Sequence, residues 1–155
     1  MKPKNCALYV SLTLLAMTSG CAVSPLQQSD PEPSLNWCPP LPNCVSTEAS
    51  TFFHKIDQFS LSMPFEKAWP HVVASVNQLP RTEISHQYQG YIYAKSYSQI
   101  FGFVDYFEVL YQANTETLNV RSGSLLGISD LLVNYRRTEQ LRESLLTKQV
   151  ISPTD

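Results

Sequence analysis

The feature that most limits the fold of this chain is a run of four strand-like segments over residues 81–122. The segments are RTEISHQYQ, YIYAKSYSQ, FVDYFEVLYQ and TLNVRS, and only a glycine, IFG and ANTE separate them. Links this short join neighbouring strands, so the run predicts an antiparallel meander. A two-residue turn at Asn114 and Thr115 would pair Glu108 with Arg121, whereas a three-residue loop would break that register.

Helical patterns flank the meander on both sides. Apolar residues recur at helical spacing over residues 64–79, with Ser62 as the expected cap and Pro70 as an expected kink or late start. Residues 135–147 form an amphipathic pattern, with arginines and glutamates on one face and, on the other, Tyr135, Thr138, Leu141, Leu145 and Leu146. With a further strand at residues 55–62, the order predicts an α+β fold. Both helices would pack on one face of a curved antiparallel sheet of about five strands, for which a helix-grip arrangement is one solution.

The first twenty residues indicate export. Lys2 and Lys4 precede CALYVSLTLLA, an apolar run of eleven residues, and small residues follow in MTSG. A helix that spans a bilayer needs about 20 apolar residues, so the segment is short for a membrane anchor. We therefore expect a signal peptide over residues 1–20.

The end of that segment, TSGC, resembles the lipobox of bacterial lipoproteins. The resemblance implies a diacylglyceryl thioether on Cys21, and hence a protein anchored by lipid in the cell envelope. An ordinary signal peptide with a chance cysteine is the alternative. Thr18 departs from the lipobox, where leucine is usual. By the same resemblance, Ala22 after the cysteine favours the outer membrane, with the domain facing the periplasm.

The remaining chain has room for one domain and its appendages. Residues 21–37 form the lipidated cysteine and a flexible linker with three prolines and three serines. Cys38 and Cys44 follow, and in an oxidising compartment they are expected to form a structural disulfide. Structural zinc would need a second ligand pair, and a redox-active site would need the spacing Cys-x-x-Cys. The α+β domain is expected at residues 38–147, and a loose tail at 148–155.

Four pieces of the domain resemble, in order, the bacterial and plastid family catalogued as domain of unknown function 1499: LPNCVST, LPRTEI, FGFVDYFEV and VRSGSLLGISDLLVNYRRTEQLR. The resemblance covers about residues 38–146 and implies no activity. Three positions depart from the family pattern, since Leu125 replaces a common arginine, Tyr106 a second acid and Leu132 a glycine. The positions that match it are Asn43, Cys44, Pro80, Arg81, Phe103, Asp105, Arg121, Ser122, Ser124, Gly127, Ser129, Asp130, Asn134 and Arg137.

The stretch VRSGSLLGISDLLVN, residues 120–134, has two interpretations. As a turn, it uses Gly123 and Gly127 for unusual backbone angles and Asn134 to cap the last helix. As a binding site, it offers arginine forks that recognise an anionic or polar ligand. The expected ligand-binding residues are Asp105, Arg121, Ser122, Ser124, Asp130, Asn134 and Arg137.

Several kinds of chemistry have little support. The three histidines stand at no motif spacing for nucleophilic catalysis. Asp105 and Glu108, three apart on one strand, point to opposite faces and do not suit a glycosidase. No cluster of metal ligands is visible, and we expect no metal and no cofactor. The formal net charge of −2, with basic residues scattered along the chain, gives nucleic acid no binding footprint.

Three hypotheses for function remain. The first is a non-enzymatic envelope module that binds a small molecule, a lipid or a partner protein. The second is an enzyme of undefined type that uses Asp105, Arg121, Ser124 and Asp130. The third is an interaction protein whose tyrosine-rich sheet face, with Tyr91, Tyr93 and Tyr97 on one side of a strand, meets a partner or lines a groove.

Overall fold

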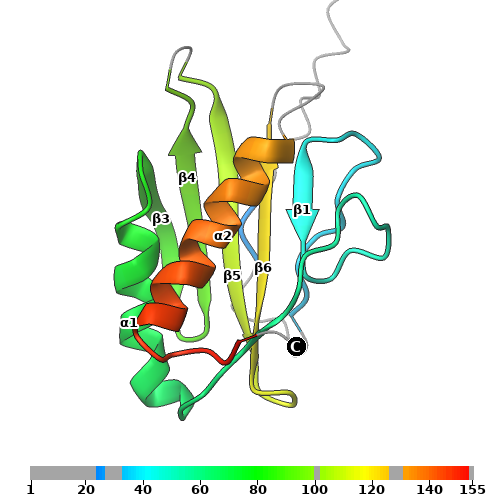
Figure 1. Ribbon diagram of the computed structural model, residues 1–155. Coiled ribbons are helices and arrows are strands. Elements are labelled where there is room, and N and C mark those ends of the chain that lie inside the picture. The colour runs from blue at the N-terminus through cyan, green and yellow to red at the C-terminus, as the bar shows by residue number, and fades with distance from the viewer. Residues whose placement is uncertain (1–23, 27–32, 100–101, 126–130, 154–155) are drawn as a thin grey trace, which may run out of the picture.

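The protein folds into a six-stranded antiparallel sheet with two helices on one of its faces (Figure 1). The structure is a computed structural model, and it describes residues 24–26, 33–99, 102–125 and 131–153. The predicted α+β class is confirmed. The sheet has six strands rather than about five, and it stays open instead of curling around a helix as a helix-grip fold requires.

The predicted meander forms the centre and one edge of the sheet. Its strands are β3 (Thr82–Tyr88), β4 (Tyr91–Tyr97), β5 (Val104–Gln112) and β6 (Thr117–Ser124). Glu108 pairs with Arg121, as predicted. That register follows from loop length, because the residues between the Gln112–Thr117 pair are centred on Asn114 and Thr115.

Two short strands complete the other edge. Strand β1 (Cys44–Ser46) and strand β2 (Phe59–Ser60) both pair with β6. The sequence predicted a longer strand around β2, over residues 55–62, and missed β1. Both segments are shorter than the alternating runs by which strands are recognised.

Helix α1 (Phe65–Asn77) buries Ala68, Val72 and Val76 against the sheet. It begins directly after Pro64 and has no side-chain cap, so the prediction that Ser62 caps it is wrong. Pro70 lies inside the helix, which continues through it; the late start expected there is also wrong. The apolar stripe decides where this helix forms, because burial outweighs one missing backbone hydrogen bond.

Helix α2 (Leu131–Thr147) begins earlier than expected, so Asn134 lies within it and does not cap it. Thr138, Leu141 and Leu145 are buried as predicted. Tyr135, expected on the same buried face, is 47% exposed. Two arginines expected to face solvent, Arg137 and Arg142, are buried at 8% and 7% exposure, whereas Arg136 is exposed. The helix therefore turns a partly polar surface toward the sheet.

We call the sheet face beneath the helices the inner face. Its hydrophobic core includes Val76, Phe107, Val120 and Leu141. The chain after α2 adds to this core: Val150 and Ile151 are buried, and Ile151 forms a bridge with Leu61. The prediction of a loose tail is therefore wrong as far as Ser152, whose backbone nitrogen donates to the Ser60 oxygen at 2.9 Å, whereas Pro153 is exposed.

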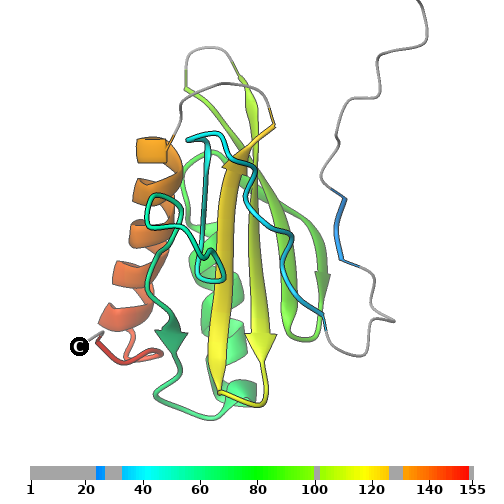
Figure 2. The same ribbon diagram turned by 90° about the vertical axis from the view of Figure 1, so that its right-hand side faces the viewer.

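The opposite, outer face is covered by residues 33–38, which we call the strap (Figure 2). Leu35 of the strap is buried against Tyr91, Tyr93, Tyr106 and Leu110. This part of the chain was predicted as flexible linker, and that prediction is wrong for the strap. The strap also covers most of the tyrosine-rich face, which the third hypothesis needs for a partner. Within the described ranges, no helix has the length and apolar character needed to cross a bilayer.

Candidate functional site

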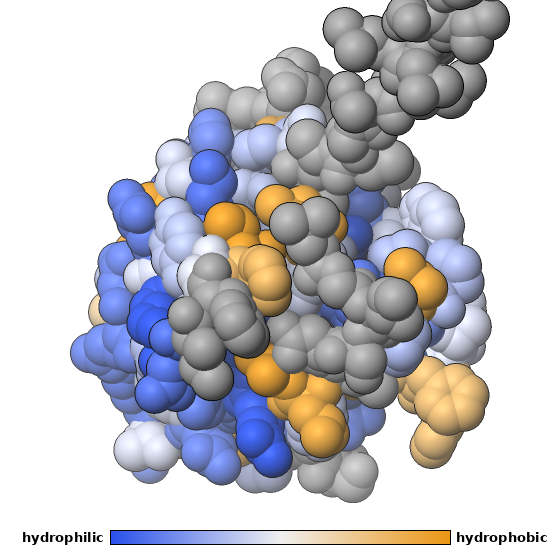
Figure 3. Space-filling view, turned by 90° about the horizontal axis from the view of Figure 1, so that it is seen from above, coloured by the Kyte–Doolittle hydropathy of each residue, from blue (hydrophilic) through white to orange (hydrophobic). Residues whose placement is uncertain are grey.

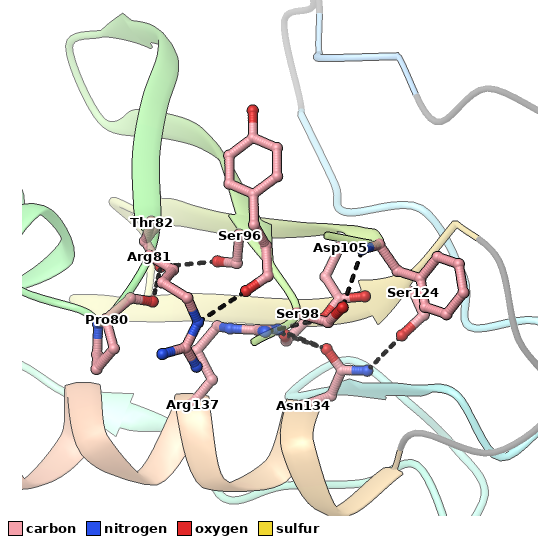
Figure 4. A network of polar contacts seen from close by, with 12 residues as sticks. Pro80, Arg81, Thr82, Ser96, Ser98, Asp105, Ser124, Asn134 and Arg137 are labelled. Carbon is pink, nitrogen blue, oxygen red and sulfur yellow. Dashed lines mark hydrogen bonds and ion pairs between the residues drawn. The ribbon is translucent and has the colours of Figure 1, made fainter. Parts of the chain in front are cut away.

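A buried polar cluster lies on the inner face where β5, β6 and α2 meet (Figure 4). Arg137 Nη2 donates to Asp105 Oδ2 at 2.8 Å, and the two side chains are 9% and 1% exposed. Its other terminal nitrogen donates to Ser122 Oγ at 3.0 Å and to Asn134 Oδ1 at 2.8 Å. Ser122 Oγ donates to the same Asn134 oxygen at 2.6 Å. The guanidinium is thus held from three sides.

Asn134 extends this cluster toward β1. Its side-chain nitrogen donates to the backbone oxygen of Asn43 at 3.0 Å and to Ser124 Oγ at 3.2 Å. The cluster joins α2 to two strands and to the chain before β1, and its polar groups bond mainly to one another. Such a closed network stabilises a fold more readily than it binds a ligand. The predicted site residues that meet here are Asp105, Ser122, Ser124, Asn134 and Arg137.

Arg121 lies on the outer face and does not join that cluster. It forms a buried ion pair with Glu108 at 2.8 Å, donates to the backbone oxygen of Trp37 at 3.2 Å, and stacks 4.3 Å above the Tyr106 ring. Adjacent residues of a strand point to opposite faces. Ser122 lies on the inner face with Asp105, so its neighbour Arg121 lies on the other side of the sheet from Asp105. The enzyme hypothesis needed both in one site. Asp130, also required there, lies outside the described residues, as do Gly127, Ser129 and Cys21.

The buried tyrosines of the outer face do not ionise at neutral pH. Burial, with smaller opposing effects of neighbouring charges, raises the pKa of Tyr106 to about 12. Burial also raises the pKa of Tyr91, and its hydroxyl donates to Glu108 Oε1 at 2.7 Å. Both phenols therefore stay neutral in ordinary conditions. Gly123, predicted as a flexible turn position, has no left-handed backbone angle; it makes room for Tyr106, which a side chain at 123 would strike.

A hollow of about 330 Å³ opens beside the inner cluster, between α2 and the ends of two strands. Three arginines line it: Arg81 before β3, and Arg136 and Arg137 on α2. Figure 4 shows Arg81 directed toward α2, and Arg137 directed toward Asp105 and Asn134. Arg81 Nε donates to the backbone oxygen of Tyr97 at 3.0 Å, and its backbone has φ 52°. A left-handed arginine is uncommon, and such strained positions concentrate at functional sites. We call this hollow the arginine pocket.

The arginine pocket is electrostatically positive. No acidic residue lines it. Asp105 neutralises Arg137, while neither Arg81 nor Arg136 has an ion-pair partner among the described residues. Ser98 and Gln140 add neutral polar groups to its wall. Two uncompensated guanidinium groups in one concave site can receive an anion.

Sequence reasoning did not assign this pocket. Arg81 stood among the family-pattern residues but not in the predicted site, and Arg136 was overlooked beside Arg137. The LPRTEI motif was the available signal for Arg81. Nothing in the sequence places Arg136 beside it, because that proximity depends on how α2 packs.

A second hollow, of about 340 Å³, lies beside the strap and is lined by Leu35, Trp37, Cys38 and His54 among others. The predicted disulfide between Cys38 and Cys44 is confirmed and forms part of its wall. His54 Nδ1 lies 2.8 Å from the backbone oxygen of Cys44 and fastens this loop. The lining offers no pair of convergent charges.

Comparisons with known proteins agree with the family motifs. The chain finds no match among curated proteins. Residues 34–145 match the family DUF1499, described as a protein of unknown function. That region contains residues 34–38 of the strap, the two hollows described above and all six strands. Since the match covers most of the chain, the protein belongs to the DUF1499 family of proteins of unknown function.

Proposed function

We propose that this protein is a lipid-anchored module of the cell envelope that binds a small anionic ligand in the arginine pocket and performs no catalysis. The observation that carries the proposal is the pair of uncompensated guanidinium groups, Arg81 and Arg136, at one hollow without acidic lining. The lipid anchor is proposed from the TSGC motif at Cys21, and Ala22 after the cysteine favours the outer membrane.

Arg81 is suited to meet a ligand. Its Nε is engaged by the backbone oxygen of Tyr97, which fixes the plane of the guanidinium. Within the described part of the chain, that bond is the sole hydrogen bond of the Arg81 guanidinium, so both of its terminal nitrogens remain for a ligand. A planar fork of this kind matches the oxygens of a phosphate or carboxylate. Because the orientation is set before binding, less conformational entropy is lost when the ligand arrives.

Arg137 has a supporting place beneath this fork. It lines the arginine pocket, but its terminal nitrogens are used by Asp105, Ser122 and Asn134. We therefore assign it to the wall and not to the charge that attracts the ligand.

Isothermal titration of the chain from residue 21 onward, with Cys21→Ser to prevent acylation, tests the proposal. The probes are inorganic phosphate and pyrophosphate. A hydrogen bond to a charged group contributes about 1.5–3 kcal/mol, so Arg81→Gln and Arg136→Gln should each weaken binding roughly 10- to 100-fold.

The matched control is Lys95→Gln, which removes one exposed positive charge from β4, outside the pocket. Binding by this variant should equal that of the parent chain. The proposal fails if the parent chain binds neither probe at millimolar concentration, or if the control loses as much affinity as the arginine variants.

A further inference from the structure

The end of the molecule that holds the arginine pocket also exposes large apolar side chains. Phe103, Leu125, Leu132 and Val133 are 49%, 36%, 66% and 41% exposed. Figure 3 views this end directly, with hydrophobic side chains gathered across its middle and hydrophilic ones around them. We call these four residues the apolar patch. Exposed apolar side chains that gather at one place commonly mark an interaction surface.

The apolar patch is continuous with the arginine pocket. Val133 belongs to both, since it also lines the pocket. Ser98, another lining residue, exchanges hydrogen bonds with Phe103: its backbone nitrogen donates to the Phe103 oxygen at 2.9 Å, and its Oγ accepts from the Phe103 nitrogen at 2.9 Å. Leu125 follows in space through its backbone bond to Val104, at 3.2 Å. Apolar and cationic groups thus share one surface.

The described residues that line the arginine pocket or form the apolar patch carry charge of one sign. Their charged members are Arg81, Arg136 and Arg137, and none of them is acidic. Exposed cations beside exposed apolar groups are complementary to an anionic bilayer, whose phosphates lie directly above its acyl chains.

We infer that this end docks on the surface of a bilayer that contains anionic phospholipid. Arg81 and Arg136 bind lipid phosphates, while Phe103, Leu132 and Val133 enter the headgroup region. The inference rests on the proposed function and deepens it, because the anion in the arginine pocket becomes a phosphate carried by a lipid. A partner protein is the competing occupant, but it would have to supply acidic and apolar groups in the same arrangement, which every anionic bilayer already has.

Co-sedimentation with vesicles tests the inference, using the chain from residue 21 with Cys21→Ser so that no acyl anchor masks weaker contacts. The vesicles contain phosphatidylcholine alone or phosphatidylcholine with phosphatidylglycerol. We expect binding to the anionic vesicles and at least ten-fold weaker binding to the neutral ones, since each of the two arginines contributes about 1 kcal/mol at an anionic surface. The double variant Phe103→Ser with Leu132→Ser should lower vesicle binding about ten-fold or more.

Two comparisons separate docking from general stickiness and from the proposed function. The control Phe52→Ser removes a side chain that is 89% exposed but lies outside the patch, and it should bind vesicles like the parent chain. The double variant should still bind inorganic phosphate, because both arginines remain and neither Phe103 nor Leu132 lines the arginine pocket. All these residues are exposed, and an unchanged thermal midpoint verifies that each variant is folded.

Each outcome decides the matter. If the parent chain binds phosphate but no vesicle, the docking inference is overturned and the anion-binding function stands. If it binds neither, both fail. Equal binding to neutral and anionic vesicles, or equal losses in the double variant and the Phe52→Ser control, also overturns the inference. Cross-linking from position 132 to a protein, without vesicle binding, would assign the surface to that protein instead.

Discussion

Separating the buried pair of Asp105 and Arg137 should cost the protein much of its stability. The change Asp105→Asn leaves the Arg137 guanidinium, only 9% exposed, without a compensating charge. Arg137→Met leaves the Asp105 carboxylate, 1% exposed, in the same condition. Breaking a buried ion pair from one side costs about 3–5 kcal/mol, because the remaining charge is neither hydrated nor paired. Each single variant should lose that amount of unfolding free energy.

The double variant should behave differently. It contains no unpaired charge, and Asn134 Oδ1 still accepts from Ser122 Oγ at 2.6 Å when the arginine is gone. Replacing a buried pair by uncharged groups of similar volume is often neutral. We therefore expect the double variant to be no less stable than either single one, which corresponds to a coupling energy of about 3 kcal/mol.

Urea unfolding with the disulfide intact, followed by tryptophan fluorescence, measures the stability of the parent chain, both single variants and the double variant. Arg136→Met, one position away on an exposed part of α2, is the control and should change stability by less than about 0.5 kcal/mol. Additive losses of that small size in Asp105→Asn and Arg137→Met would refute the reasoning. Arg137 would then be unpaired in solution, and a third arginine would be available to the ligand.

Three further predictions concern the strap, the disulfide and the anchor. Burial raises the pKa of the Tyr106 phenol from 10 to about 12. The contribution of this phenol to the free energy of unfolding is therefore complete below pH 10 and is lost, at about 1.4 kcal/mol per pH unit, as the pH rises toward 12. Unfolding measured across this window should show that Tyr106→Phe removes this part of the pH dependence. Replacing Cys38 and Cys44 by alanine opens a loop with a sequence separation of 6, which should cost about 2 kcal/mol in denaturant unfolding and speed hydrogen exchange at the Leu35 amide. Cys21→Ser should abolish incorporation of labelled palmitate, and undiminished labelling would exclude the lipid anchor.

The meander was predictable because its information is local. Alternating residues and short links define β3 to β6, and the register of Glu108 with Arg121 depends only on the loop between two strands. Strand β1 was not predictable in this way. Its three residues, Cys44–Ser46, form a strand only because β6 lies beside them.

The polar residues were harder to place. Periodicity assigns an arginine on a helix to solvent, yet Arg137 is buried because the sheet presents Asp105 to it. Asp105 is distant from Arg137 in sequence, and no pattern within α2 indicates that the two residues are in contact. The split of the predicted site was foreseeable, however. The alternation that separates Asp105 from Glu108 also separates Arg121 from Ser122, so grouping all of them in one site ignored the period of a strand.

The strap and its disulfide determine how the domain would respond to a mechanical pull on its N-terminal side. The strap rests on the sheet through side-chain contacts and isolated bonds, such as that from Gln112 to the backbone oxygen of Pro33 at 3.1 Å, and is not a strand of the sheet. A pull would peel it away residue by residue until it reached Cys38. There the covalent link passes the force directly to Cys44, at the start of β1, so the loop between the cysteines is never stretched. Moderate tension would therefore uncover Tyr91 and Tyr93 while the sheet behind them stayed intact, and this reversible yielding would protect the fold whenever the N-terminal side is pulled.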